Sequence, residues 1–274
     1  MGVFSSILRV IIMLISSKEN ALIKEYIKLR DKSKYRRETG LFVLEGSRIA
    51  MDAVLEKVDI KYAFITEEAR VRYPETASAL ENYLGSSLYD ITNDIAERIA
   101  DTKGSQGIFA IAKRLDKPVV MNKINNGSKF VILNSLQDPG NVGTILRAAD
   151  ACGIDCVFLT GDSCDVYNPK IVRSTMGSLF RLPVCDDYGY SELLQMLKNE
   201  GVLTCASVID KDAESVRGFN FLKSCAVVIG NEGNGLTREE ALMCDKRITI
   251  KMSGNINSLN AAMAASIIMW EMTK

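Results

Sequence analysis

The sequence predicts an α/β protein whose second half folds around a parallel sheet. From Asn20 onward, stretches with helical hydrophobic period alternate with stretches of strand character. The second half contains near-continuous apolar runs such as Lys129–Leu136, which are typical of strands covered by helices on both faces. The 274 residues are 47% hydrophobic, which is enough for a sizeable core in one or two domains.

The first hundred residues of this pattern predict a small α/β sandwich. Turn formers and capping residues separate its elements. We expect, in order, a helix at Asn20–Lys34, a strand at Leu41–Gly46, a helix capped by Ser47 and reaching Lys57, a strand at Tyr62–Thr66, a helix at Pro74–Tyr83, a strand at Leu88–Ile91, a helix at Asn93–Asp101 and a strand at Gly107–Arg114.

A linker is expected next, at residues 115–128, because this stretch holds Pro118 and an NNGS tract and shows no strong period. Beyond it, five buried strands alternate with helices, which indicates a doubly wound parallel sheet. The strands are Lys129–Leu136, Cys156–Thr160, Val202–Val208, Cys225–Gly230 and Arg247–Met252. The helices are Val142–Cys152, Pro169–Phe180, Ser191–Asn199, Thr237–Met243 and Leu259–Met272.

The composition excludes several classes of function. The 34 basic and 34 acidic residues cancel, and the pI near 6.4 argues against a protein that coats nucleic acid by bulk charge. There is no histidine, which excludes His-based zinc sites, Ser-His or Cys-His nucleophiles and a histidine base. The seven cysteines form no C-x-x-C pair and are typical of small buried hydrophobes in a reducing compartment, so we expect a cytoplasmic protein.

Residues 1–17 are expected to be an extension that is not part of the fold. The apolar run Val10–Ile15 is too short to cross a bilayer, which takes about 20 residues. Arg9 is the only charge ahead of it and no A-x-A cleavage pattern follows. We favour an extension upstream of a natural start at Met13, and a helix lying on a membrane surface is the alternative.

The first motif is NSLQDPGNVGTILRAADACG, residues 134–153, where a strand runs into a DPGN turn and then a helix. Pro139 presets its own dihedral angle and Gly140 permits a sharp reversal. Amides at the helix start suit a phosphate, and Arg147 lies on the same side of the helix as Gly143. Taken alone, the pattern fits an ordinary strand-turn-helix joint with a surface arginine equally well.

The second motif is CAVVIGNEGNGLTREE, in which Gly230, Gly233 and Gly235 directly follow a buried strand. Such glycines leave room for a ligand to approach the backbone, and Glu232 would place a carboxylate beside it. The G-x-x-G-x-G spacing matches neither the dinucleotide fingerprint nor the P-loop. A structural turn before a helix capped by Thr237 explains it about as well.

The third motif is RITIKMSGNINSLNAAMAASIIMWEM, in which a buried strand leads through a polar loop to a helix rich in alanine. The alanines let another backbone pack closely, either inside the core or across a homodimer face. Periodicity alone says little about the chemistry of this segment.

Together and in this order, the three motifs resemble those of the SpoU/TrmH family of RNA ribose 2'-O-methyltransferases. The resemblance covers Lys129–Lys274. The family pattern N-x-x-DPxN-x-G-x-x-x-R-x-A is met by Asn134, Asp138, Pro139, Asn141, Gly143, Arg147 and Ala149, GxEGxG by Gly230, Glu232, Gly233 and Gly235, and SLN by Ser258, Leu259 and Asn260. The chain departs from the family in having Lys251 where a proline is usual.

The resemblance implies a domain with a deep trefoil knot that binds S-adenosylmethionine as methyl donor, needs no metal and forms a homodimer. It places Gly230, Ile250, Leu259 and, less directly, Ser207 in the cofactor pocket. It makes Arg147, Asn141, Glu232, Ser258 and Asn260 the catalytic set. Because arginine keeps its proton in proteins, we expect Arg147 to act as an electrostatic clamp, with a substrate phosphate or Glu232 taking the proton.

Residues 18–114 are similar to the L30e-like RNA-binding domain that precedes the catalytic domain in ribosomal RNA members of this family. Local positive charge is what recognition of an RNA backbone requires, and six basic residues fall within ten positions. These expected RNA contacts are Lys28, Arg30, Lys32, Lys34, Arg36 and Arg37, with Tyr35 available to stack on a base. A solvated helix end is the other interpretation.

We therefore expect a methyltransferase acting on ribosomal RNA, with RNA as its partner and no membrane association. Transfer RNA as the substrate and a catalytically silent RNA-binding scaffold are the alternatives. The L30e-like domain favours ribosomal RNA, and the intact Arg147, Glu232 and Asn260 argue against a scaffold. A nucleotide-dependent oxidoreductase fails on glycine spacing.

Overall fold

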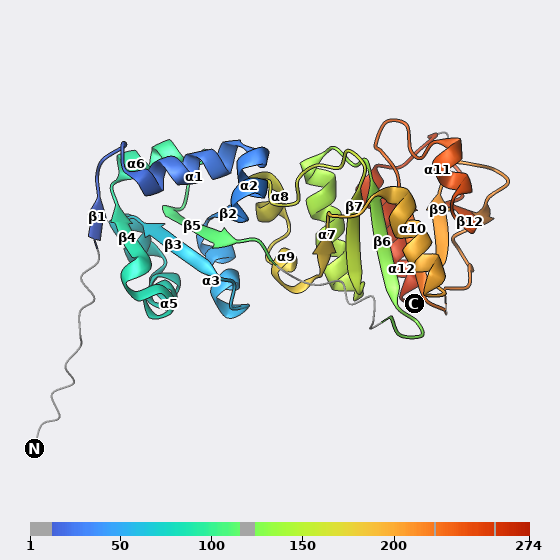
Figure 1. Cartoon of the computed structure of the whole chain (residues 1–274), viewed down its shortest axis with the longest axis horizontal. Coiled ribbons are helices and arrows are strands. Elements are labelled where there is room, and N and C mark those ends of the chain that lie inside the picture. The colour runs from blue at the N-terminus through green and yellow to red at the C-terminus, as the bar shows by residue number, and fades with distance from the viewer. Residues whose placement is uncertain (1–12, 116–123, 222, 255) are drawn as a thin grey trace, which may run out of the picture. The chain divides into compact units, whose positions relative to one another are not determined.

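The computed structural model describes residues 13–115, 124–221, 223–254 and 256–274. The chain divides between Leu115 and Asp116 into two compact units, drawn from blue to green and from green to red in Figure 1. Within the described residues, no helix is long and apolar enough to cross a membrane.

The first unit is a mixed sheet with helices on both faces. Its strand order is β1-β4-β3-β5-β2, with β5 antiparallel to both β2 and β3 and the other pairs parallel. The elements are β1 (Met13–Ile15), α1 (Ala21–Asp31), α2 (Ser33–Thr39), β2 (Leu41–Glu45), α3 (Ser47–Leu55), β3 (Ile60–Ile65), α4 (Glu67–Arg72), α5 (Pro74–Leu84), the 3-10 turn η1 (Gly85–Ser87), β4 (Leu88–Ile91), α6 (Asn93–Ile99) and β5 (Ile108–Lys113).

Tyr26 fixes helix α1 on the sheet of the first unit. Its ring is fully buried and meets Phe64 and Phe109 edge-on, at centroid distances of 6.1 and 5.7 Å. Its hydroxyl donates to the carbonyl of Leu44 (3.1 Å), so the polar end of this buried side chain is satisfied.

Three expectations for the first unit are wrong in detail. The helix expected at Asn20–Lys34 breaks at Lys32, whose backbone is extended between α1 and α2. Ser47 is the first residue of α3 rather than its cap, because its hydroxyl is buried against that of Thr76 (2.8 Å). Met13–Ile15 is not outside the fold, since it pairs with β4 and buries Ile15. Residues 1–12 lie outside the described residues.

The second unit is a seven-stranded sheet in the order β10-β12-β9-β11-β6-β7-β8, and every pairing is parallel. This confirms the predicted parallel α/β fold. The elements are β6 (Lys129–Asn134), α7 (Pro139–Cys152), β7 (Cys156–Thr160), α8 (Pro169–Ser174), α9 (Ser178–Arg181), β8 (Val184–Cys185), α10 (Tyr190–Asn199), β9 (Leu203–Ser207), β10 (Glu214–Ser215), β11 (Cys225–Ile229), α11 (Arg238–Leu242), β12 (Lys246–Thr249) and α12 (Ala261–Met272).

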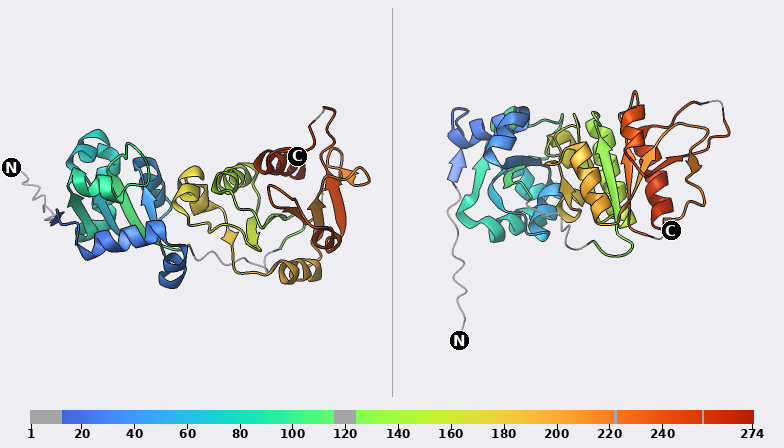
Figure 2. Two further views of the ribbon diagram at one scale, coloured as in Figure 1. Left: turned by 90° about the horizontal axis from the view of Figure 1, so that it is seen from above. Right: turned by 45° about the vertical axis from the view of Figure 1, so that its right-hand side comes forward.

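Helices cover both faces of this sheet, with α7 and α12 on one side and α10 on the other, as the left view of Figure 2 shows. The leucines of α10 pack on Phe130, Phe158 and Val228. Because β11 lies between β6 and β9 and all run the same way, the segments that follow them leave the sheet at one edge. The first two motifs are therefore neighbours in space.

Two details of the second unit differ from the sequence prediction. The helix expected at Pro169–Phe180 is two short helices, because Met176 and Gly177 adopt positive φ between them. The edge strands β8 and β10 were not expected, since two residues each leave no hydrophobic pattern to detect. The NNGS turn of the expected linker is held by Ser224, which accepts from the amide of Gly127 (3.1 Å) and donates to the carbonyl of Asn125 (2.7 Å).

All seven cysteines are free thiols. Burial raises the pKa of Cys225 to about 11. Such thiols remain protonated and serve as packing groups, as the sequence predicts.

Candidate active site

The DPGN segment of the first motif forms the start of helix α7. Asp138 is the N-cap and accepts from the amide of Gly140 (2.6 Å), and Pro139 occupies the first helical position. This is a standard helix start, because proline loses no hydrogen bond there. The sharp turn comes earlier, at Ser135, whose φ of 59° swings the chain away from β6.

The glycine loop of the second motif folds back on its own strand. A Cβ on Gly230 would lie 2.4 Å from the carbonyl carbon of Gly235 and 2.5 Å from the amide nitrogen of Leu236. Its missing side chain therefore makes room for the backbone of the loop itself rather than for a ligand. Asn231 holds this loop, since its Oδ1 accepts from the amide of Gly233 (2.9 Å) and its Nδ2 donates to the carbonyl of Ser135 (2.9 Å).

A buried polar link ties the first motif to the helix after this loop. Asn134 accepts from Thr160 Oγ1 (2.8 Å) and donates to Glu240 Oε1 (2.7 Å). Glu240 also forms a reciprocal capping box with Thr237, as the Thr237 cap predicts. This link fixes α11 relative to β6.

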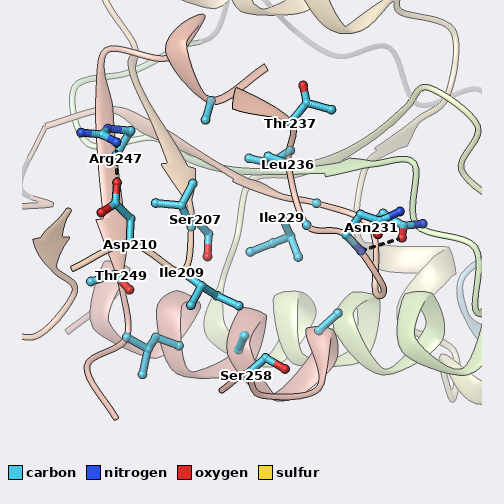
Figure 3. Close-up of a pocket in the computed structure, with 18 of the residues that line it drawn as sticks. Ser207, Ile209, Asp210, Ile229, Asn231, Leu236, Thr237, Arg247, Thr249 and Ser258 are labelled. Atoms are coloured by element: carbon cyan, nitrogen blue, oxygen red, sulfur yellow. Dashed lines mark hydrogen bonds and ion pairs between the residues drawn. The ribbon is translucent and has the colours of Figure 1, made fainter. Parts of the chain in front are cut away.

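A cavity of about 710 Å³ opens between the glycine loop, the ends of β9 and β12 and the start of α12 (Figure 3). Four of the residues that line it are the expected cofactor contacts, Ser207, Gly230, Ile250 and Leu259. Ile250 and Met252 face the cavity while Lys251 between them is exposed, so the lysine that replaces the usual proline does not line this cavity. Its volume and its mixed polar and apolar wall fit S-adenosylmethionine.

An ion pair at the far wall of this cavity has no counterpart among the sequence predictions. Arg247 Nη1 donates to Asp210 Oδ2, as the left side of Figure 3 shows. The two residues lie 37 positions apart and meet only because β12 pairs with β9. Asn231 was missed too, although an asparagine between two turns after a strand is a recognisable sign of an Asx turn.

The carboxylate of Glu232 accepts three hydrogen bonds from residues of the first motif. Oε2 accepts from the amide of Gln137 (3.1 Å), and Oε1 accepts from the amide of Asp138 (2.9 Å) and from Asn141 Nδ2 (3.1 Å). Partial burial raises the pKa of Glu232, but these three donors outweigh it and hold the pKa below its ordinary value. A carboxylate so engaged is a poor proton acceptor.

The third motif is hydrogen-bonded to the first motif through Asn260, whose Nδ2 donates to Asn141 Oδ1 (3.0 Å). Asn260 also caps α12 by accepting from the amides of Ala262 and Met263. Asn260, Asn141 and Glu232 thus form one continuous chain of hydrogen bonds.

Two hollows of about 570 and 650 Å³ flank the Asn141–Asn260 pair. Ser258 lines the second hollow as well as the large cavity, so the two spaces share a wall. Arg147 lines neither hollow. Its side chain is exposed on α7 and makes no hydrogen bond or ion pair with the described part of the chain.

The basic run of the first unit is only partly available to RNA. Arg36 is 3% exposed and donates to the carbonyls of Leu29 (2.6 Å) and Arg30 (3.0 Å) at the end of α1. Arg30 donates to the carbonyls of Arg98 and Ala100 (both 3.1 Å) at the end of α6. Both guanidiniums cap helix ends, so Arg36 is wrong as an RNA contact and Arg30 is largely committed to the fold.

The other four members of the run, Lys28, Lys32, Lys34 and Arg37, are exposed. Lys28 Nζ lies 5.7 Å from the ring centroid of Tyr35. That ring is partly buried against the core of the first unit, which limits its use for stacking on a base.

Within the described residues, no group of three or more Cys, Asp or Glu side chains is placed to hold a metal ion. The hollows beside the Asn141–Asn260 pair are lined by amide side chains, by the carboxylates of Asp138 and Glu232 and by the ammonium group of Lys170.

Two family profiles together match most of the chain. The MRM3-like substrate binding domain matches residues 20–110, and the SpoU rRNA Methylase family matches residues 128–270, which is more than half of the chain. The chain belongs to the SpoU rRNA methylase family. The predicted family is thus confirmed, with a substrate-binding domain ahead of the methylase domain.

Relatives and solved structures agree with this membership. The chain is 30% identical to the 23S rRNA (guanosine(2553)-2'-O)-methyltransferase RlmP of Bacillus subtilis strain 168, over 94% of this chain and 98% of that protein. An AdoMet-bound rRNA methyltransferase from Sinorhizobium meliloti has a TM-score of 0.81 and 26% identity, over 95% of this chain and 97% of that one. The SpoU methyltransferase AviRb from Streptomyces viridochromogenes, in complex with AdoMet, has a TM-score of 0.83 and 25% identity, over 93% and 97%.

Proposed function

We propose that this SpoU family enzyme transfers the methyl group of S-adenosylmethionine to a ribose 2'-hydroxyl of ribosomal RNA. The observation that carries the proposal is the hydrogen-bonded frame of Glu232, Asn141 and Asn260, which lies next to a cavity of cofactor size. The named activities of its relatives, which modify 23S rRNA, supply the substrate class.

The large cavity holds the cofactor through Ser207, Gly230, Ile250 and Leu259. Bound there, S-adenosylmethionine supplies a methyl group already activated on a sulfonium. The residues of the chain then have to position the ribose and manage its hydroxyl proton.

Glu232 orients rather than accepts, because its carboxylate already binds three donors and its pKa is lowered. Asn141 and Asn260 fix the wall against which the ribose lies. The family resemblance assigns the guanidinium of Arg147, which lines neither hollow of its own copy, to stabilise negative charge on the acceptor oxygen or its neighbouring phosphate. With Glu232 engaged, the proton passes through a phosphate of the substrate to solvent, and S-adenosylhomocysteine is the leaving group.

The experiment compares Arg147→Ala with Arg217→Ala, an exposed arginine of the same unit that lies outside the three cavities. Both variants should bind S-adenosylmethionine like the wild type in calorimetry. Only Arg147→Ala should lose methyl transfer to a large-subunit rRNA transcript, with the modified ribose mapped by primer extension. Equal activity of the two variants contradicts the role of Arg147.

The same mapping separates the alternatives. A transfer RNA enzyme would leave the large-subunit transcript unmodified and methylate bulk transfer RNA. A silent scaffold would bind RNA and methylate neither. The continuous Asn260–Asn141–Glu232 frame favours an enzyme, because RNA binding alone does not need it.

A homodimer is part of the proposal. Helix α12 exposes Met263, Ile267 and Trp270, which repeat at helical spacing along one face, and Trp270 is 65% exposed. Met263 and Ile267 also line the smaller hollow, so a second copy on this face would close the site. Trp270→Glu should convert a dimer to a monomer in sedimentation, and an unchanged mass would contradict this assignment. The knot implied by the family resemblance stays a prediction.

The first unit binds RNA through Lys28, Lys32, Lys34 and Arg37 in this proposal. Its match to a substrate-binding domain supports that assignment. A cytoplasmic location is part of the same proposal, in keeping with relatives named for modifying ribosomal RNA in bacteria.

A further inference from the structure

We propose that Lys170 binds a phosphate of the RNA strand beside the target ribose and so positions the acceptor nucleotide. The inference rests on the proposed function and adds a residue to it. Lys170 belongs to α8, outside the three motifs, and it lines both hollows that flank the Asn141–Asn260 pair.

The packing of α8 on α7 determines where Lys170 lies. A Cβ on Gly143 would fall 2.8 Å from Ser174 Cβ and 3.3 Å from the carbonyl oxygen of Ile171, so the glycine lets the two helices approach closely. Asn168 caps α8 by accepting from the amide of Lys170 (2.9 Å). The backbone of Lys170 is therefore fixed beside the start of α7.

The side chain of Lys170 is exposed and makes no hydrogen bond or ion pair with the described part of the chain. It is the only cation among the described residues that line either hollow. Two carboxylates face the same space, but Asp138 accepts from the amide of Gly140 and Glu232 binds its three donors. The ammonium group is thus left for a ligand.

The chemistry of RNA identifies that ligand. A ribose 2'-hydroxyl is adjacent to the phosphodiester on its own 3' carbon, so a nucleotide whose hydroxyl reaches the Asn141–Asn260 wall brings a phosphate within a few ångströms. Lysine suits this task, since its ammonium is a compact charge on a flexible stem. A phosphate contact positions the strand without selecting its sequence.

The test measures RNA affinity as a function of salt for Lys170→Ala, Lys170→Arg and Lys211→Ala. Lys211 is an exposed lysine of the same unit that lines neither hollow, so its variant has the same change in charge. The probe is an unmodified large-subunit rRNA transcript. Lys170→Ala should weaken binding about tenfold and lower the slope of log affinity against log salt by about one. Lys170→Arg and Lys211→Ala should stay close to the wild type.

Turnover completes the test. The KM for RNA should rise about tenfold in Lys170→Ala, with cofactor affinity and melting temperature unchanged. An affinity and salt slope equal to those of Lys211→Ala overturn the inference, and so does a loss of cofactor binding, which would make Lys170 structural. If the wild-type protein itself methylates no ribose in large-subunit or transfer RNA, the proposed function fails instead.

Discussion

In the first unit, residues that are close together in the sequence do not form one surface site. In the second unit, residues that are far apart in the sequence meet in one site. In the first unit, six basic residues lie together between Lys28 and Arg37, yet two of them cap helix ends and are withdrawn from solvent. In the second unit, Asn141, Glu232 and Asn260 span 119 positions and form one hydrogen-bonded chain. Density of charge along a sequence is therefore a weaker guide to a binding site than the identity of residues at the ends of parallel strands.

The physical reason is that the arginines of the first unit are used to cap helix ends, whereas the site residues of the second unit follow parallel strands. An α-helix leaves its last four carbonyls without partners inside the helix. The guanidinium of a nearby arginine can donate hydrogen bonds to them. The ends of parallel strands, by contrast, meet at one edge whatever their separation along the chain. Four substitutions test this difference between the two units.

The largest effect is expected from Gly230→Ala. The new methyl group would collide with the backbone of Gly235 and Leu236 and force the loop off the cavity wall. We expect about 100-fold weaker binding of S-adenosylmethionine, or about 3 kcal/mol, measured by calorimetry. Gly254→Ala is the matched control, because nothing lies within 4 Å of its Cβ position. Equal affinities in the two variants would disprove the close-packed loop.

The second largest effect is expected from Arg36→Ala, which should lower the free energy of unfolding of the first unit. It removes the donor for two carbonyls at the end of α1, at a cost of about 2 kcal/mol. Arg37→Ala should leave the melting temperature unchanged and weaken RNA binding slightly, since Arg37 is exposed. Chemical denaturation of both variants checks this, and the reverse order of effects would restore the interpretation of Arg36 as an RNA contact.

Glu232→Gln should lower turnover about tenfold, the cost of weakening one charge-assisted hydrogen bond. The pKa of Glu232 is lower in the folded protein than in the unfolded chain. Its ionised form therefore stabilises the fold above about pH 4.5, and this contribution disappears as the pH falls below that value. The difference in melting temperature between wild type and Glu232→Gln should shrink between pH 6 and pH 3. A constant difference would mean that the charge of Glu232 does not hold the turn.

The smallest effect is expected from Thr237→Ala. Loss of the capping box should cost about 1 kcal/mol and release Glu240 from the loop, while its bond to Asn134 persists. Cofactor affinity should fall by a few-fold at most. Thr273→Ala, at the exposed end of α12, is a control that should leave the affinity unchanged.

Sequence reasoning found the elements with a strong local signal. Strands β4 and β7 begin and end where they were predicted, because alternating or continuous apolar residues end at clear turn formers. Sequence reasoning missed the features that depend on contacts between distant parts of the chain. The break between α8 and α9 depends on Met176, a non-glycine residue with positive φ that no propensity predicts. The pair Arg247–Asp210 depends on strand pairing.

The α/β class, the family and the motif residues can be inferred from the sequence alone, because strand and helix periods and short motifs are local properties of a chain. The contacts that those residues make depend on the folded arrangement. The tertiary structure showed that Glu232 accepts three hydrogen bonds, that Gly230 accommodates its own loop and that Lys170 lines the hollows. Hydrogen-bond partners and burial come from residues far apart in the chain, so no local pattern can encode them.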